Sequence, residues 1–404
     1  MHLVILNLAY RPELTTPELL LDRFRTLPAW AEAVLNAARQ SGVADPRVTV
    51  VQRFGVDAEL ERAGVLYRFV GDGGPAPWRW WRPSRRVLAT AASACRDVGS
   101  GRGAVVHVHG LGSGAVVPGL CRRLPAGVPV LVQHHAELPA RGFSGVLQRR
   151  GLRAADGFLF AARGLSQPWR QRGAIRGDVP VFEVMEGSTD FRPTERDGAR
   201  RRTGLSGAPL LLWVGRLDAN KDPLTVLTGF EGVLRELPGA RLAMAYGPNS
   251  PLLGAVESRV AGSAALARTV RLLGTLPHSD LESVYNSADL FVLGSYHEGS
   301  GFALAEALAC GVVPVVTDIP SFRMMTGGGT VGTLWPPGRP DALAEALRPA
   351  AGWPLPELSA AARALFDERL SWPAIGRAAV AAYVEVLAAA ERRAGAGSGR
   401  ENPS

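Results

Sequence analysis

The chain has 404 residues, of which 47% are hydrophobic and 20% charged, and its net charge is +8. This length predicts two globular domains with ample cores. Since we find no apolar run near the ~20 residues of a spanning helix, we expect no integral membrane protein. The cysteines Cys95, Cys121 and Cys310 have neither metal nor redox spacing, which predicts a reducing compartment without a disulfide framework.

The basic residues are almost all arginine, and Lys221 is the only lysine. A positive balance fits an anionic ligand, an acidic membrane surface or nucleic acid. A single retained lysine suggests a site that needs a compact ammonium group. Alternatively, the bias to arginine reflects a GC-rich genome and Lys221 is retained by chance.

The first half reads as alternating strands and helices. Residues 3–9 predict a first strand rather than a signal peptide, and no G-x-G-x-x-G follows it, which disfavours a dinucleotide oxidoreductase. Residues 19–39 have helical periodicity. Further strands are expected at 48–53, 65–70, 104–110, 128–135, 155–160 and 181–185.

Histidines close two of these strands. His109 ends one, and the pair His134 and His135 ends the next. Carboxyl ends of parallel strands line the ligand crevice of an α/β sheet, which predicts a binding role. A zinc site would have Glu137 as its only further candidate ligand, so we expect no metal. Structural histidines that cap strand ends stay open as an alternative.

A Trp- and Arg-rich segment runs from Trp78 to Arg86 and includes Trp80 and Trp81. It fits a patch on an anionic membrane or an amphiphilic acceptor. The other interpretation is a helix start that packs its tryptophans. Nothing else in the sequence supports nucleic-acid binding.

The second half restarts the alternation after a boundary between about 190 and 208. Strands are expected at 209–216, 240–246, 269–273, 288–293 and 311–317, with helices from 224 and at 280–287, 340–347 and 373–390. Arg216 and Lys221 bracket one strand-to-helix loop, and two cations there suit a diphosphate. A solvated loop with an Arg216–Asp218 pair is the alternative.

The loop after the strand at 288–293 is the richest in candidate ligand groups. Glu298 lies on it, Gly299 and Gly301 allow a close backbone approach, and the amides of Ser300 to Ala303 open a helix as anion donors. Glu306 lies about one helical turn further on. We interpret Glu298 as a carboxylate that binds a sugar, the amides as donors to a phosphate, and Glu306 as a carboxylate that binds a ribose diol. The alternative for Glu306 is an ordinary solvated residue of the helix.

These motifs resemble those of glycosyltransferase family 4, retaining enzymes with the GT-B fold. The resemblance covers nearly all of the second half. It rests on Gly215-Arg216-Leu217 with Lys221, on Glu298 and Glu306 spaced as E-x7-E, and on the boundary segment Glu186-Gly187 with Phe191-Arg192-Pro193.

The resemblance implies an α/β GT-B fold, two Rossmann-like domains with a cleft between them. The implied organisation is an acceptor-side domain at 1–195, a nucleotide-sugar domain at 205–370, a helix at 371–390 that crosses back to the first domain, and a disordered tail at 391–404. It also implies a metal-independent hexosyltransferase that uses a nucleotide-diphosphate sugar as co-substrate, with no cofactor.

The resemblance also assigns roles to residues. His135 and Glu298 would be catalytic, with His134 as fallback and His109 a further cleft candidate. The donor would be bound by Arg216, Lys221, Gly299, Ser300, Gly301, Phe302, Ala303 and Glu306. Tyr10-Arg11-Pro12 replaces the family's Gly-Gly loop, and Glu186 replaces its common Asn.

The acceptor is open: a small molecule, a glycan or a lipid-linked molecule. We expect a cytoplasmic protein, at the inner face of the membrane if Trp78, Trp80 and Trp81 contact it. A GT-B sugar-nucleotide epimerase and a non-catalytic sugar-nucleotide-binding protein are the alternative functions.

Overall fold

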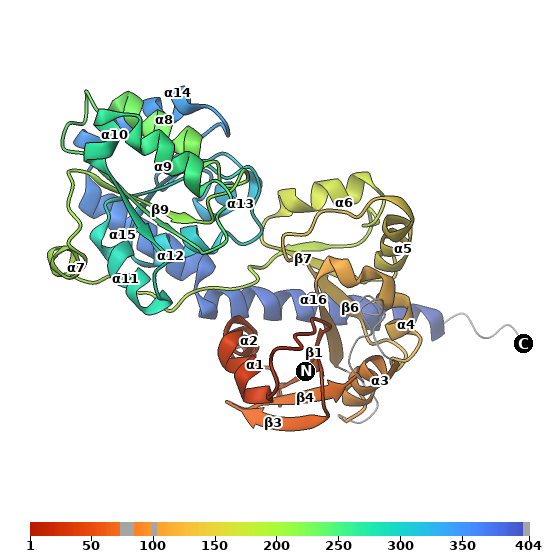
Figure 1. The fold of residues 1–404 in the computed structure, drawn as a ribbon. Helices are drawn as coiled ribbons and strands as arrows, with labels where there is room; N and C mark the ends of the chain where they lie inside the picture. Colours follow the sequence, from red (N-terminus) through yellow and green to blue (C-terminus); the bar gives the residue numbers. More distant parts are fainter. Residues whose placement is uncertain (73–84, 98–102, 399–404) are drawn as a thin grey trace, which may run out of the picture. The chain divides into compact units, whose positions relative to one another are not determined.

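The structure, a computed structural model, describes residues 1–72, 85–97 and 103–398. The chain forms two compact units: unit 1 holds Met1–Gly187 and the segment from Trp372 onward, and unit 2 holds Ser188–Ser371. Each unit is a parallel α/β sheet with helices on its faces (Figure 1). The proposed contact residues Trp78, Trp80 and Trp81 lie outside the described residues.

The sheet of unit 1 has eight strands in the order β3-β4-β2-β1-β5-β6-β7-β8. All neighbours pair in parallel except β3 and β4. The inner strands are apolar and buried, as expected when helices cover both faces of a parallel sheet. The strands are β1 (His2–Asn7), β2 (Arg47–Phe54), β3 (Ala58–Arg62), β4 (Val65–Gly71), β5 (Ala104–His109), β6 (Val130–Gln133), β7 (Gly157–Phe160) and β8 (Val181–Glu183).

The helices of unit 1 differ from the prediction at one place. The expected helix at 19–39 is two helices, because Phe24 leaves the helical conformation with φ −109° and ψ 62°. The described helices are α1 (Pro17–Arg23), α2 (Thr26–Gln40), α3 (Arg85–Ala94), η1 (Leu111–Val116), α4 (Val117–Cys121), α5 (Gly142–Leu152), η2 (Arg163–Ser166), α6 (Gln167–Gln171) and α16 (Trp372–Ser398).

Helix α16 packs against α2, so the chain returns to unit 1 after completing unit 2. The contact is close: a Cβ on Gly376 would lie 2.3 Å from the carbonyl oxygen of Ala33. We expected a disordered tail from residue 391, and this is wrong for residues 391–398, which continue α16. An ion pair of 2.7 Å between Arg393 and Asp156 holds that end.

Among the residues that the structure describes, one helical stretch, Leu355–Gly395, is long and apolar enough to cross a membrane by length and composition. Its most apolar window has a mean hydropathy of 1.3, but half of that window is buried inside the structure. Burial of this kind is what the core helix of a globular unit shows, so the stretch is weak evidence for a membrane span.

Unit 2 has a six-stranded parallel sheet in the order β11-β10-β9-β12-β13-β14. Its strands are β9 (Leu210–Gly215), β10 (Arg241–Tyr246), β11 (Val270–Gly274), β12 (Leu290–Leu293), β13 (Val313–Thr317) and β14 (Thr333–Trp335). Its helices are α7 (Arg196–Thr203), α8 (Pro223–Val233), α9 (Leu253–Ala261), α10 (Ala264–Thr269), α11 (His278–Ser287), α12 (Phe302–Ala309), α13 (Pro320–Met325), α14 (Pro340–Leu347), η3 (Arg348–Gly352), α15 (Leu355–Leu365) and η4 (Phe366–Leu370).

The boundary between the units falls after Gly187, before the predicted residue 195. The reason is a set of contacts with α11: the amide of Arg192 donates to Glu282 (2.8 Å) and the amide of Thr194 donates to Asn286 (2.7 Å). Residues 188–195 are therefore part of unit 2.

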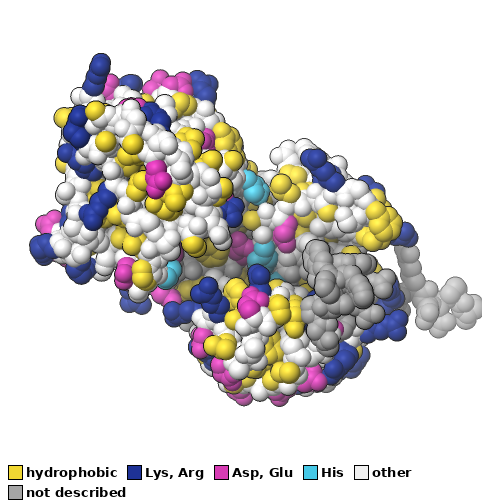
Figure 2. All heavy atoms as spheres, viewed as in Figure 1, with side chains coloured by type: hydrophobic (Ala, Val, Ile, Leu, Met, Phe, Trp, Pro, Cys, Tyr) yellow, Lys and Arg dark blue, Asp and Glu magenta, His cyan; other side chains and the backbone are white. Residues whose placement is uncertain are grey.

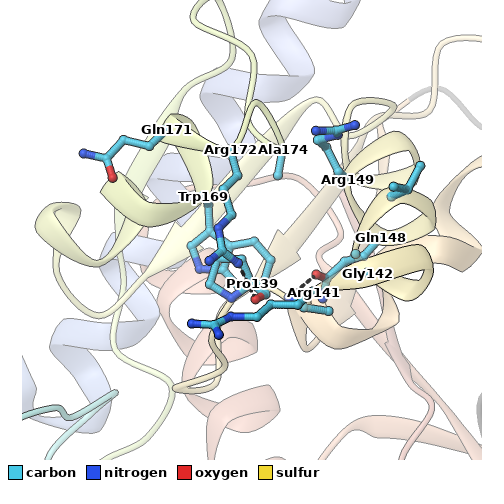
Figure 3. Close-up of a pocket in the computed structure, with 12 residues that line it drawn as sticks. Pro139, Arg141, Gly142, Gln148, Arg149, Trp169, Gln171, Arg172 and Ala174 are labelled. Carbon is cyan, nitrogen blue, oxygen red and sulfur yellow. Dashed lines mark hydrogen bonds between the residues drawn. The ribbon is translucent and has the colours of Figure 1, made fainter.

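Basic side chains are spread over the surface in view (Figure 2). A pocket of about 390 Å³ opens in unit 1, lined by residues of α5, of α6 and of the segments beside them (Figure 3).

Candidate functional site

The loop between β9 and α8 is organised around the carboxylate of Asp218. Its Oδ1 accepts the amide of Lys221 (3.0 Å) and its Oδ2 accepts Nε of Arg216 (2.6 Å). Burial raises the pKa of Asp218, but these bonds outweigh burial and hold the pKa below its ordinary value. Arg216 nevertheless keeps 62% of its side chain exposed, so its guanidinium can reach a further anion.

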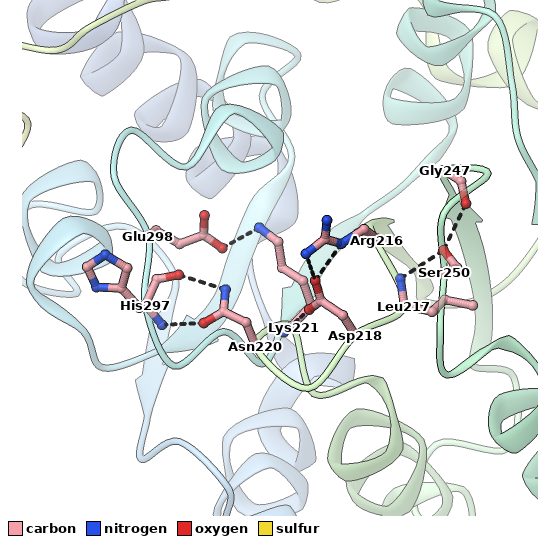
Figure 4. Close-up of polar contacts among 9 residues, drawn as sticks. All are labelled: Arg216, Leu217, Asp218, Asn220, Lys221, Gly247, Ser250, His297 and Glu298. Carbon is pink, nitrogen blue, oxygen red and sulfur yellow. Dashed lines mark hydrogen bonds and ion pairs between the residues drawn. The ribbon is translucent and has the colours of Figure 1, made fainter. Parts of the chain in front are cut away.

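The predicted residues Lys221 and Glu298 meet in an ion pair between Nζ and Oε1. Their side chains are only 20% and 11% exposed, respectively. Figure 4 shows Lys221 reaching toward Glu298, with the ammonium and the guanidinium of Arg216 on the same side of the loop. The ammonium of Lys221 and the carboxylate of Glu298, which were predicted from separate motifs, are therefore in direct contact.

A second set of contacts joins the β9–α8 loop to the β12–α12 loop. The side-chain amide of Asn220 donates to the carbonyl of His297 (2.9 Å) and accepts its backbone N–H (3.1 Å). Gly294 permits this approach, since a Cβ there would lie 3.2 Å from the carbonyl of Asp222 and 3.3 Å from that of Lys221. Asn220 was missed from the sequence, where it reads as an ordinary turn residue.

The glycine-rich segment forms the entry to α12. Gly301 has φ +57°, and a Cβ on it would lie 3.0 Å from the ring of Phe322. Both the backbone conformation and the close ring therefore disfavour any residue with a side chain here. The carbonyl of Glu298 accepts the hydroxyl of Ser321 at 2.5 Å. Helix α12 begins at Phe302 after the N-cap Gly301, so Phe302 and Ala303 supply its first amides, whereas Gly299 and Ser300 precede the helix. Contact of these four residues with a ligand stays a prediction.

Glu306 has partners on α11. Its Oε2 accepts the hydroxyl of Tyr285 (2.9 Å), and its Oε1 lies 3.2 Å from Nε2 of His278. Burial and the Glu306 charge raise the pKa of Tyr285 well above its ordinary value, so this phenol stays a donor. Among the described residues, no hydrogen bond or ion pair joins Glu306 directly to Lys221 or Glu298. Tyr285 and His278 were missed, because their spacing on α11 has no motif.

In unit 1 the adjacent residues His134 and His135 differ in their burial and in their partners. His134 is 2% exposed and stacks on Phe160, with ring centroids 4.7 Å apart. His135 is 33% exposed, and its Nδ1 lies 2.6 Å from Oε2 of Glu186. Burial lowers the pKa of His135, but the bond to Glu186 and the charges of Glu186 and Glu137 outweigh it and raise the pKa. His135 is thus the more accessible of the two, and Glu186 orients it.

His109 lies between His135 and a further buried histidine, His107. The ring of His109 is 4.6 Å from that of His107 and 5.0 Å from that of His135. Nδ1 of His107 lies 2.9 Å from the hydroxyl of Tyr383 on α16. Burial lowers the pKa of His107 to about 3 and that of His109 well below its ordinary value, so both rings are neutral near pH 7. His107 was missed, and Glu186 was named only as a departure from the family motif, since nothing in the sequence predicts the contacts of either residue.

Over the described ranges of the chain, no group of three or more His, Cys, Asp or Glu side chains is arranged to hold a metal ion. The side chains described above offer instead cations, a paired carboxylate and backbone donors in unit 2. These are groups that bind a phosphorylated ligand.

The fold and the sequence of unit 2 agree on the class of protein. Residues 195–351 match the family described as "Glycosyl transferases group 1". The chain has the GT-B fold of two parallel α/β units with a C-terminal helix. The resemblance drawn from the motifs is therefore confirmed for unit 2: residues 195–351 form a group 1 glycosyltransferase domain.

Among the relatives are D-inositol 3-phosphate glycosyltransferases of Mycobacterium tuberculosis (strain H37Rv) and Mycobacterium bovis (strain BCG / Pasteur 1173P2). Each is 31% identical over 172 residues, which is 41% of this chain and 35% of the relative. The match thus spans about a third of the length of these relatives.

Solved structures resemble nearly the whole chain. Sucrose-phosphate synthase from Thermosynechococcus elongatus has a TM-score of 0.65 at 18% identity, covering 96% of this chain and all of the other. A glycosyltransferase from Rickettsia africae has a TM-score of 0.64 at 15% identity, covering 95% and 98%. Anabaena HepE, solved with UDP and glucose, has a TM-score of 0.63 at 14% identity, covering 96% and 100%. At these identities the likeness establishes the fold alone.

Proposed function

We propose that the chain is a retaining glycosyltransferase that moves a sugar from a nucleotide-diphosphate sugar to an acceptor without a metal ion. The observation that carries the proposal is the contact of Lys221 with Glu298 beside the Arg216–Asp218 pair. It joins a phosphate-binding cation to a sugar-binding carboxylate at the carboxyl ends of β9 and β12, where ligands bind in such sheets.

The leaving diphosphate gains negative charge as the anomeric bond breaks. Arg216, Lys221 and the first amides of α12 would stabilise that charge in place of a metal. Glu306 would accept the ribose hydroxyls. The bond from Tyr285 supports this role, because it fixes the carboxylate, and Oε1 lies beside the exposed ring of His278.

The ion pair also indicates what donor binding changes. Without a ligand, Lys221 neutralises Glu298 in a poorly solvated position, which avoids a buried lone charge. A bound diphosphate would pair with the ammonium of Lys221 in place of Glu298. The carboxylate of Glu298 would then accept hydrogen bonds from hydroxyls of the transferred sugar. Donor binding would thus prepare the group that orients the sugar.

His135 would act at the sugar and phosphate from unit 1. Its proximity to Glu186 favours the protonated ring, which is able to donate to an anionic oxygen. In the retaining reaction the acceptor attacks from the face of the leaving group, and a phosphate oxygen takes the acceptor's proton. We propose a cytoplasmic reaction, with a small-molecule, glycan or lipid-linked acceptor.

The neighbours' ligands suggest the first experiment. Because Anabaena HepE was solved with UDP and glucose, a thermal-shift screen would start from uridine nucleotide sugars and extend to other bases. A bound donor raises the unfolding midpoint by mass action. Slow hydrolysis of the same donor without acceptor would separate an enzyme from a binding protein, and anomeric NMR of the product would test retention. If no nucleotide sugar raises the midpoint or is hydrolysed, the proposal fails.

A further inference from the structure

An apolar patch lies on the outside of unit 1, at α5 and the segment before it. We define the patch as Leu138, Phe143, Val146 and Leu147, which are 67%, 79%, 47% and 41% exposed. The buried residues of α5 are Gln148, Gly151 and Leu152, whereas its other large apolar side chains, Phe143, Val146 and Leu147, face solvent. In Figure 2 hydrophobic side chains gather where α5 lies in Figure 1, with basic side chains at the edge.

The segment that carries the patch has an excess of positive charge. Residues 138–155 contain four arginines (Arg141, Arg149, Arg150 and Arg153) and no acidic residue. Within the described parts of the chain, neither Arg141, Arg149 nor Arg150 forms an ion pair, whereas many other arginines do. This surface therefore attracts anions.

The pocket shown in Figure 3 adjoins the patch. Its volume is about 390 Å³, and its lining includes Val146 of the patch, the indole of Trp169 and three arginines, Arg141, Arg149 and Arg172. Arg172 donates to the carbonyl of Pro139 (2.7 Å), which fixes one guanidinium in the lining. The pocket can thus receive a phosphate group next to exposed apolar side chains.

We propose that this surface docks on a bilayer that contains acidic phospholipids. A lipid phosphate enters the arginine-lined pocket, and Phe143, Leu147 and their neighbours insert at the level of the headgroups. An amphipathic helix with basic flanks binds membranes through this combination of apolar burial and charge. A soluble phosphate ligand would account for the arginines but not for four exposed apolar side chains. None of the residues of the patch or of the pocket belongs to the proposed donor site in unit 2.

The test is flotation of the purified full chain with vesicles of phosphatidylcholine, with and without one-third phosphatidylglycerol. Binding is expected on the acidic vesicles only, and it should fall as salt rises because the charges are screened. Phe143→Ser with Leu147→Ser should weaken binding at least about tenfold. Arg141→Gln and Arg149→Gln should each weaken it about fivefold.

Matched controls separate this site from general effects. Leu19→Ser removes an exposed leucine of α1 (51% exposed), and Arg339→Gln removes an exposed arginine that is paired with Asp341; both variants should bind vesicles normally. Circular dichroism establishes that each variant is folded.

Three outcomes would overturn the proposal. One is equal binding of the native chain to neutral and acidic vesicles. Another is stabilisation by inorganic phosphate without any vesicle binding, which would indicate a soluble anion site. The third is normal vesicle binding by the Phe143 and Leu147 variant while a Trp78, Trp80 and Trp81 to Ser variant is released.

Discussion

The ion pair of Lys221 and Glu298 offers a way to separate structural from catalytic roles. We consider three variants: Lys221→Met, Glu298→Gln and the double variant. Each single variant leaves one charge without its partner at a position that is at most 20% exposed. Breaking a fully buried pair costs about 3–5 kcal/mol of unfolding free energy, so partial exposure here reduces the expected loss to about 2–3 kcal/mol.

The double variant should behave differently for stability and for turnover. Two neutral side chains leave no uncompensated charge, so the unfolding free energy should return to within about 1 kcal/mol of the native chain. Turnover should not return, because the groups aimed at the diphosphate and the sugar are both missing. Loss of one well-placed charged donor lowers kcat by about 10²–10³.

The assay is urea unfolding followed by circular dichroism, together with donor turnover for all four chains. Arg339→Gln serves as control, since it breaks an exposed pair with Asp341 elsewhere in unit 2. Recovery of turnover in the double variant would show that the pair acts only through stability. Native turnover in either single variant would remove that residue from the chemistry.

Three further predictions concern contacts away from this pair. Tyr285→Phe removes a hydrogen bond to a poorly exposed carboxylate, so unit 2 should lose about 1.5–3 kcal/mol in urea unfolding, and the KM for the donor should rise if Glu306 binds the ribose. Glu186→Gln should lower the pKa of His135 in an NMR titration; since Glu186 raises that pKa, its stabilisation is present below the unfolded value of about 6.5 and is lost as pH rises through the folded value. An unchanged titration would show that Glu186 does not control His135. Gly376→Ala should cost about 1–3 kcal/mol, because its Cβ would lie 2.3 Å from a backbone oxygen of α2; an unchanged unfolding midpoint would contradict that packing.

The sequence predicted the sheets well where strands are buried on both faces. The expected strand at 209–216 is β9 at Leu210–Gly215, and the expected helix at 340–347 matches α14. It missed β3, whose sequence AELER is polar and largely exposed, because pairing with β4 and not burial defines that strand. Helix α5 was missed because most of its large apolar residues, Phe143, Val146 and Leu147, do not face the core.

The sequence predicted which residues form the candidate site, but it did not predict most of the contacts between them. The motifs placed Lys221 and Glu298 on loops that follow two separate strands, and the structure brings the two side chains together. Spacing could not predict the bond of Tyr285 to Glu306 or that of Glu186 to His135, since these partners come from other elements of each unit. The roles of His109, His134 and His135 in catalysis stay predictions.

The return of α16 to unit 1 has a consequence for biosynthesis. Tyr383 on that helix covers His107 in the core around Trp30, yet the ribosome makes it only after the whole of unit 2. The N-terminal unit therefore cannot finish folding while the middle of the chain is being translated. Unit 2 is contiguous from Ser188 to Ser371, so it can finish folding on the ribosome before unit 1 does.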